Sequence, residues 1–190
     1  MGRFIFFLLA LAFSIKATSQ APGLVLQTGL TTLYSKDPNI TKDGEMHYGW
    51  MVGADARILE GNMYFIIGAQ YISTSLRSSA DPEFFRKRDW TMLNGRCGLG
   101  FNILRLSEKL ALRSKILGSI NFTMDSPKGG LGVDGYRALN DSSLGAVTGL
   151  GLTIGMFDLD LEYQYGILNA YNLQPKSTFD GFTLMAGFHF

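Results

Sequence analysis

Apolar and polar residues alternate along most of this chain, and the alternation occurs in eight separate segments. In most segments the large apolar side chains fall mainly on one parity, and polar residues or glycines fall mainly on the other. A repeat of two residues is typical of a β-strand that has one apolar face. The segments predicted as strands are residues 23–34, 47–59, 62–74, 90–103, 109–122, 143–156, 157–167 and 179–190.

The third segment is apolar on both parities, so its alternation leaves its orientation ambiguous. We assign Phe65, Ile67, Ala69 and Tyr71 to its apolar face. The connections between segments give a second signal, because they alternate between long and short. Residues 35–46, 76–89, 123–142 and 168–178 are the long ones.

Strand length and loop rhythm together indicate the architecture. The segments run to about ten to thirteen residues, whereas ordinary strands have about five or six. A strand that crosses a bilayer at a tilt needs about nine to eleven residues. Barrels in an outer membrane have long loops outside and tight turns on the periplasmic side. We therefore predict an all-β fold, an eight-stranded antiparallel up-and-down transmembrane β-barrel, with both ends of the chain on the tight-turn side.

Charged residues within the predicted strands define the inner face. Four are acidic and four are basic, and all eight lie on the parity opposite the apolar stripe. An Arg or Lys that faces lipid near the bilayer midplane costs about 2–4 kcal/mol. A solvated face of a secreted sheet is the alternative. The predicted interior network consists of Asp55, Arg57, Arg96, Arg113, Lys115, Asp158, Asp160 and Glu162.

An eight-stranded barrel is only wide enough to be filled by its own side chains. Buried charges there must pair, because an unpaired buried charge is expensive. We expect glycines of the sixth segment to leave room for long Arg and Lys side chains, and the filled interior argues against a wide pore. These glycines are Gly145, Gly149, Gly151 and Gly155.

Aromatic residues gather near the ends of the predicted strands. Two aromatic girdles at the membrane interfaces would have this distribution; aromatics scattered through a core are the alternative. We expect one girdle near the long loops, from Tyr34, Tyr48, Trp50, Tyr71 and Trp90. The other, near the tight turns, would contain Phe157, Phe188 and Phe190.

The first residues are typical of a secretory signal. Arg3 precedes the apolar run FIFFLLALAFSI, and small residues follow at 17–19. We predict a signal peptide at residues 1–19 and a barrel domain at residues 20–190; a single membrane anchor is the alternative. Cys97 is the only cysteine, so no disulfide framework is expected, and we interpret it as a small apolar strand residue.

The composition excludes some functional classes. A formal charge of +1 without a Lys/Arg cluster gives no reason to expect a nucleic-acid partner. The only histidines, His47 and His189, fall at opposite ends of the predicted barrel, so a hydrolytic triad is not expected. The loop at 37–44 resembles a calcium loop only loosely, because its glycine is misplaced. We predict no enzyme activity, no metal site and no cofactor.

The signal segment, the eight alternating strands, the loop rhythm and the aromatic Phe190 resemble the outer-membrane β-barrel family of OmpA/OmpX-type proteins. The richness in Gly and Tyr and the Gln20 start are more similar to the PorT-like barrels of Bacteroidota. This resemblance implies an outer-membrane location in a Gram-negative cell envelope and a structural or surface-interaction role. It also implies an assembly signal that the barrel assembly machinery reads, with periplasmic chaperones as further partners. Its residues here are Phe182, Leu184, Phe188 and Phe190.

One long loop suggests a lipid contact. Its two phenylalanines could lie at the acyl boundary of lipopolysaccharide and its three cations on the phosphates, although a solvated loop is the alternative. These residues are Phe84, Phe85, Arg86, Lys87 and Arg88. The residues do not identify a surface or secretion-system partner. Two other functions stay open: an outer-membrane enzyme that modifies lipid A, and a soluble secreted calycin-like ligand-binding barrel, which would have an apolar interior and a polar exterior.

Overall fold

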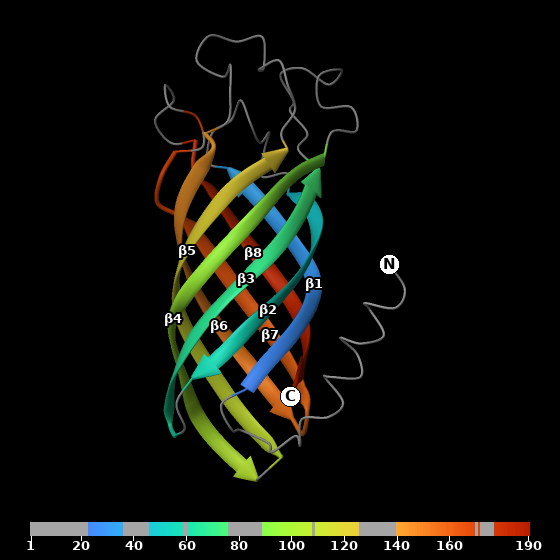
Figure 1. Cartoon of the computed structure of the whole chain (residues 1–190), viewed down its shortest axis with the longest axis vertical. Helices are drawn as coiled ribbons and strands as arrows, with labels where there is room; N and C mark the ends of the chain where they lie inside the picture. The colour runs from blue at the N-terminus through green and yellow to red at the C-terminus, as the bar shows by residue number, and fades with distance from the viewer. Residues whose placement is uncertain are drawn as a thin grey trace.

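The structure of the protein is a computed structural model. It describes residues 23–35, 46–58, 61–75, 89–107, 109–125, 140–169, 171 and 177–190. Within these ranges all regular structure is β-strand (Figure 1). The strands are β1 (Gly23–Ser35), β2 (His47–Ile58), β3 (Met63–Ser75), β4 (Asp89–Ser107), β5 (Leu110–Asp125), β6 (Ser142–Ile154), β7 (Phe157–Gly166) and β8 (Phe179–His189). The described residues contain no helix long and apolar enough to cross a membrane.

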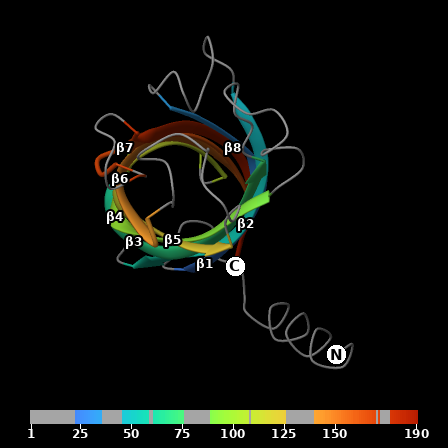
Figure 2. The same cartoon turned by 90° about the horizontal axis from the view of Figure 1, so that it is seen from above.

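Each strand pairs antiparallel with the next one in sequence, and β8 pairs back with β1, which closes the sheet. Seen from above, the strands form a complete ring (Figure 2). Closure leaves no sheet edge along the wall, and it places the interior on one parity of every strand. The prediction of an eight-stranded antiparallel up-and-down barrel is confirmed.

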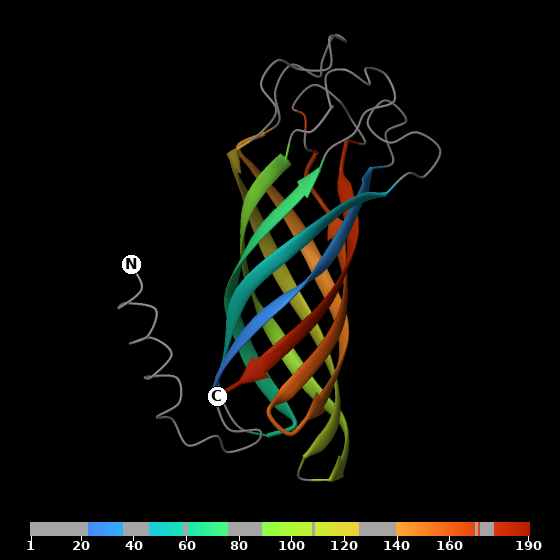
Figure 3. The same ribbon diagram turned by 90° about the vertical axis from the view of Figure 1, so that its right-hand side faces the viewer.

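The tight turns lie together at one end of the barrel, as predicted, and the C-terminus is at the same end (Figure 3). Between β6 and β7 the chain reverses through Gly155 and Met156. Gly155 has a φ of +64°, a left-handed conformation that glycine adopts without the steric cost that a side chain would bring. The sequence had placed Gly155 in the interior glycine column, but the reversal needs it in the turn instead.

One pair of strands is longer than the sequence predicted. The predicted segment ended at residue 103, but β4 continues to Ser107 and β5 begins at Leu110. The register between them shifts once at the far end, between Thr91 and Met92, and twice near the turn, between Asn102 and Leu104 and again between Arg105 and Ser107. These β-bulges interrupt the two-residue period, which is why the alternation of the sequence appeared to end there.

The assignment of faces holds on all eight strands, including the ambiguous third one. On β3, Tyr64 and Ile66 are buried whereas Ile67 is 49% exposed, so the chosen phase is correct. Cys97 faces outward and is exposed. The outer surface therefore carries most of the large apolar side chains, and the interior contains most of the charge.

Trp90 is an exception to the predicted aromatic girdles. It is buried inside the barrel, with its ring centroid 5.0 Å from that of Phe179. The reason is parity, because Trp90 adjoins Thr91 on the outer face and must point the other way. The outer aromatics do gather near the strand ends: Trp50 contacts Tyr71 near the long connections, while Phe188 contacts Phe157 near the tight turns.

Candidate functional site: the barrel interior

The predicted charged residues come from four strands, and the closure of the barrel brings them together. On β7, Asp158, Asp160 and Glu162 occupy alternate positions, so the pleat directs all three carboxylates inward. β2 contributes Asp55 and Arg57 from the opposite wall. The cations of β4 and β5 lie between these carboxylates. The structure places all eight residues on the inner face.

Arg96 contacts carboxylates from two separate strands of the barrel. It donates hydrogen bonds to Asp55 on β2 and, at 2.9 Å, to Glu162 Oε2 on β7. Lys115 takes the other side of Glu162 at 2.5 Å and also reaches Asp160 at 3.2 Å. These contacts cross the barrel from one wall to the other, which only a filled interior permits.

The contacts continue without a break towards the tight turns. Arg113 Nη2 lies 3.1 Å from Asp160 and 2.9 Å from Asp158, and Arg57 lies 2.6 Å from the second oxygen of Asp158. Acid and base alternate along this series, so each interior cation except Arg57 bridges two carboxylates. We call the eight residues the interior ion network; in order of contact they are Asp55, Arg96, Glu162, Lys115, Asp160, Arg113, Asp158 and Arg57.

Every side chain of the interior ion network is at most 10% exposed. Room for them comes partly from glycine on β6. A Cβ on Gly149 would lie 3.1 Å from Lys115 Cε, and one on Gly151 would lie 3.1 Å from Arg113 Nη2. A side chain at Gly151 would therefore clash with the Asp160 carboxylate, and one at Gly149 would require Lys115 and Glu162 to shift. Gly145 instead adjoins Ser119 and Gln164, so it makes room for neutral residues.

Neutral residues that the sequence did not single out complete the network. Tyr64 is one: its hydroxyl accepts a hydrogen bond from Arg113 at 3.5 Å, and Arg57 lies 5.6 Å from its ring centroid. Thr153 donates to Asp158 at 2.7 Å. The Gln70 amide lies beside Arg96, and with its oxygen turned to the guanidinium it accepts at 3.0 Å from Nη2. The ambiguous phase of 62–74 had hidden Tyr64 and Gln70.

Asp180 is a further charge within the predicted strands that the sequence analysis did not include. It lies on the outward parity at the beginning of β8, yet it is 1% exposed. Its carboxylate accepts hydrogen bonds from the Gly166 N–H at 2.9 Å and from the Tyr163 hydroxyl at 3.3 Å. Asp180 therefore satisfies the backbone at the end of β7, and the rule that all strand charges face inward has this exception.

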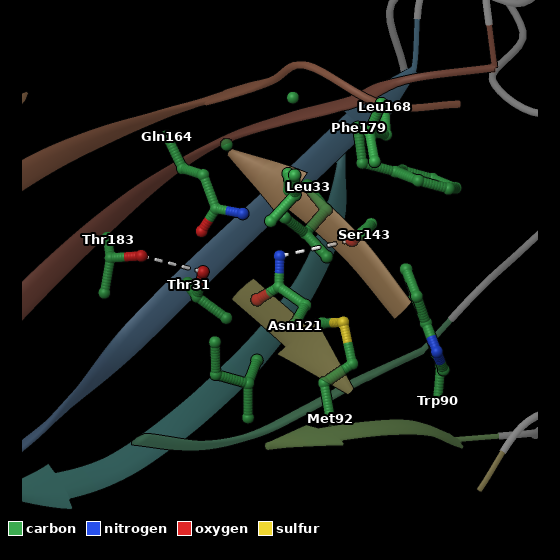
Figure 4. A pocket seen from close by; sticks show the side chains of 14 residues that line it. Thr31, Leu33, Trp90, Met92, Asn121, Ser143, Gln164, Leu168, Phe179 and Thr183 are labelled. Carbon is green, nitrogen blue, oxygen red and sulfur yellow. Dashed lines mark hydrogen bonds between the residues drawn. The ribbon is translucent and has the colours of Figure 1, made fainter. Parts of the chain in front are cut away.

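The half of the interior nearer the long connections contains no member of the interior ion network. It has a neutral polar layer, in which Thr31 bonds Thr183 at 2.9 Å and Asn121 donates to Ser143 at 3.3 Å (Figure 4). Above this layer lie apolar side chains that include Leu33, Trp90, Met92 and Phe179. The cavity between them leaves about 20 Å³ of space for the centre of a water molecule, which is enough for about one water. As it stands, this cavity is too small for a sugar or a lipid chain.

The other predicted site residues are placed as follows. Phe182 and Leu184 are exposed on the outer face, and Phe188 contacts Phe190 at 4.8 Å between ring centroids. The two histidines are buried at opposite ends of the barrel. The described residues contain no group of His, Cys, Asp and Glu that could hold a metal ion. The segment 84–88 and the predicted signal peptide lie outside the described residues.

Solved structures share this architecture. The crystal structure of Neisserial surface protein A superposes with a TM-score of 0.58 at 12% identity, over 88% of this chain and 96% of that one. The crystal structure of Ail, the attachment invasion locus protein of Yersinia pestis, gives 0.47 at 14% identity, over 89% and 99%. No protein-family model matches the chain, and no curated protein matches it. The likeness to the neisserial protein establishes the barrel fold.

Proposed function

We propose that this protein is a small integral outer-membrane β-barrel with a structural or surface-interaction role, and that its filled interior does not form a wide pore. The observation that carries the proposal is the inverted polarity of the wall. Arg96, Lys115 and Glu162 are buried inside, whereas Leu30 is 69% exposed and Ile116 is 63% exposed outside. Only an apolar solvent stabilises this arrangement.

A soluble calycin-like barrel would have the opposite arrangement. Soluble monomers rarely expose contiguous apolar patches larger than a few hundred Å². Here the exposed aliphatic side chains continue around the barrel, for example Leu26 on β1, Ile67 on β3, Leu150 on β6 and Leu184 on β8. In water this surface would drive aggregation, and in a bilayer it faces acyl chains.

The proposal of a surface role rests on the fold and on what the family resemblance implies. Neisserial surface protein A has the same architecture. The strand ends that border the four long connections lie at one end of the barrel, and in outer-membrane barrels the long loops are outside the cell. We further propose that residues 84–88 contact lipopolysaccharide there, and that the chain arrives through a cleaved signal peptide at residues 1–19.

Assembly would depend on the closing strand. We propose that the barrel assembly machinery reads Phe182, Leu184, Phe188 and Phe190, after periplasmic chaperones deliver the chain. Deleting Phe190 should then reduce the amount of folded protein in the outer membrane strongly. Its refolding in detergent micelles should change little, since only part of an interfacial side chain's roughly 1.5–3 kcal/mol of burial is lost. Normal abundance in cells would contradict this assignment.

The competing enzymatic function, modification of lipid A, has less support. A hydrolytic site needs a nucleophile, a base and an orienting group within hydrogen-bond reach. His47 belongs to the loop end of β2 and His189 to the turn end of β8, so the two cannot share one site. The charged groups of the interior are bound to one another. We therefore propose a non-enzymatic role.

Membrane fractionation combined with a heat-modifiability gel tests the central proposal. The protein should sediment with outer membranes, and the unboiled sample should migrate differently from the boiled one, because a closed barrel resists SDS until it is heated. A boiled sample of the same fraction is the control. Recovery in the soluble periplasm, without a mobility difference, would contradict the proposal.

A further inference from the structure

The β4–β5 hairpin extends farther than the other connections at the tight-turn end of the barrel (Figure 3). β3 pairs with β4 only as far as Met63 and Phe101, whereas β5 continues to pair with β4 as far as Leu110 and Ser107. Residues 102–107 therefore extend beyond the end of β3. We call this segment the hairpin end.

Aliphatic side chains dominate the hairpin end. Ile103 is 54% exposed, Leu104 is 50% exposed and Leu106 is 61% exposed. In a regular strand, adjacent residues would face opposite sides of the sheet, but Ile103 and Leu106 are the extra residues of the two bulges. The bulges therefore expose three aliphatic side chains within four residues.

These side chains are continuous with the apolar belt of the barrel. Leu104 is the register partner of Leu112, and Leu112 is the partner of Leu152, both on the outward parity of their strands. The β4–β5 hairpin also reaches farther at the tight-turn end than the β6–β7 turn (Figure 3), so the belt is longer along β4 and β5 than along β7. This continuity points to the same solvent for both surfaces, namely lipid.

At the hairpin end, the backbone edge of β4 beside residues 102–105 is already covered, so an added strand cannot pair with it there. The Asn102 N–H donates to Asn62 O at 2.8 Å, and the side chains of Asn102 and Arg105 each donate to Gly61 O at 2.8 Å. The turn before β3 therefore covers this edge, and the bulges disrupt the ladder that an added strand would need. A peptide bound by strand addition fits this edge poorly.

Two exposed cations accompany the aliphatic side chains, Arg105 within the hairpin end and Lys109 immediately after it. The Arg105 guanidinium gives one nitrogen, Nη2, to Gly61 O. Its other N–H groups can bind anions. Aliphatic side chains beside Arg and Lys suit the boundary between acyl chains and phosphates.

We propose that the hairpin end is an anchor in the phospholipid leaflet at the tight-turn side. Ile103, Leu104 and Leu106 insert among the acyl chains, and Arg105 and Lys109 bind the phosphates. The inference rests on the proposed membrane location and goes beyond it, because it predicts a barrel whose apolar span is longer on one side. Such a barrel sits tilted in the bilayer, since tilt shortens the effective span of its longer side.

Single-tryptophan fluorescence in vesicles of brominated phosphatidylcholine tests the anchor. The background replaces the native tryptophans by Trp50→Phe and Trp90→Phe, and Leu106→Trp is the reporter. We expect a blue-shifted emission and a loss of intensity relative to vesicles without bromine. Leu104→Trp is a second reporter in case the first variant folds poorly.

Two further reporters make the outcomes distinguishable. Leu150→Trp, in the middle of the belt, should be quenched, and Asn62→Trp, at the neighbouring turn, should remain in water and unquenched. Quenching at the belt without quenching at Leu106→Trp and Leu104→Trp would overturn the anchor and leave the hairpin end free for a periplasmic protein. Absence of quenching at Leu150→Trp as well would overturn the membrane barrel itself.

Discussion

The two halves of the barrel interior are filled by different chemistry, although the same eight strands enclose both. Towards the tight turns, acids and bases alternate in one continuous series from Asp55 to Arg57. Towards the long connections, Leu33, Met51, Trp90 and Phe179 pack as an ordinary apolar cluster. Ion pairs stabilise one half of the interior, and closely packed apolar side chains stabilise the other.

This difference teaches how each half responds to change. In the charged half, a removal is costly where a neighbour loses its last opposite charge, because a buried charge without compensation is expensive. In the apolar half, removing a side chain leaves a cavity that flexible neighbours can partly fill. The charged half should therefore be sensitive to the identity of each residue, and the apolar half mainly to its volume.

Arg96→Met should have the largest effect of four changes that test this comparison. Among the described residues Arg96 is the only ion-pair partner of Asp55, which would be left buried and charged. Breaking a buried pair in this way costs about 3–5 kcal/mol. Urea unfolding in lipid vesicles would measure the loss in free energy of unfolding.

Two companions of Arg96→Met sharpen the result. Leu99→Met changes an outward side chain on the same strand, leaves the interior ion network intact and should change stability little. Adding Asp55→Asn to Arg96→Met should recover part of the loss in stability, because residue 55 then no longer carries a buried, unpaired charge. Wild-type stability of the single variant would mean that Arg96 is hydrated rather than buried.

Met51→Ala should come next, with a loss of about 2–4 kcal/mol, because Met51 is fully buried in the apolar half. Its neighbours Met92 and Met185 are flexible and can occupy part of the space. Val52→Ala is the matched control, since it shortens an outward side chain and leaves the interior filled. An equal loss for both would show that packing in this half is loose.

Glu162→Gln should cost less than either change, about 1–2 kcal/mol, the difference between charged and neutral hydrogen bonds. Glutamine keeps the shape of the side chain. Arg96 retains Asp55 and Lys115 retains Asp160, so neither cation loses its last carboxylate. Glu162→Leu, which removes both acceptor oxygens, should cost more; if the two variants were equally stable, the ion pairs of Glu162 would contribute nothing.

Thr183→Val should have the smallest effect, about 0.5–1 kcal/mol, the usual contribution of one neutral hydrogen bond. It removes the partner of the Thr31 hydroxyl, which can still donate to Phe182 O, 3.4 Å away. Thr183→Ser keeps the hydroxyl and should restore most of the stability. A loss as large as that of Met51→Ala would mean that the polar layer, rather than the apolar cluster, holds this half together.

The sequence by itself determined the number of strands, their order and the faces of each one. It could do so because the pleat turns a two-residue repeat directly into an inside and an outside, and because the cost of a charge in hydrocarbon fixes which is which. Asp158, Asp160 and Glu162 could thus be assigned to the interior from parity alone. The ends of β4 and β5 could not, since two bulges broke the repeat on which the prediction depended.

Only the tertiary structure decided which acid contacts which base. Arg96 and Glu162 lie on strands that are not neighbours, and their contact depends on the closure of the sheet and on the shift in height between one strand and the next. The same holds for Tyr64, which joins the interior ion network from the strand with the ambiguous pattern, and for Trp90, whose partner Phe179 comes from the far end of the sequence. A local pattern carries the direction of a side chain, but its partner across the barrel is set by the closure of all eight strands together.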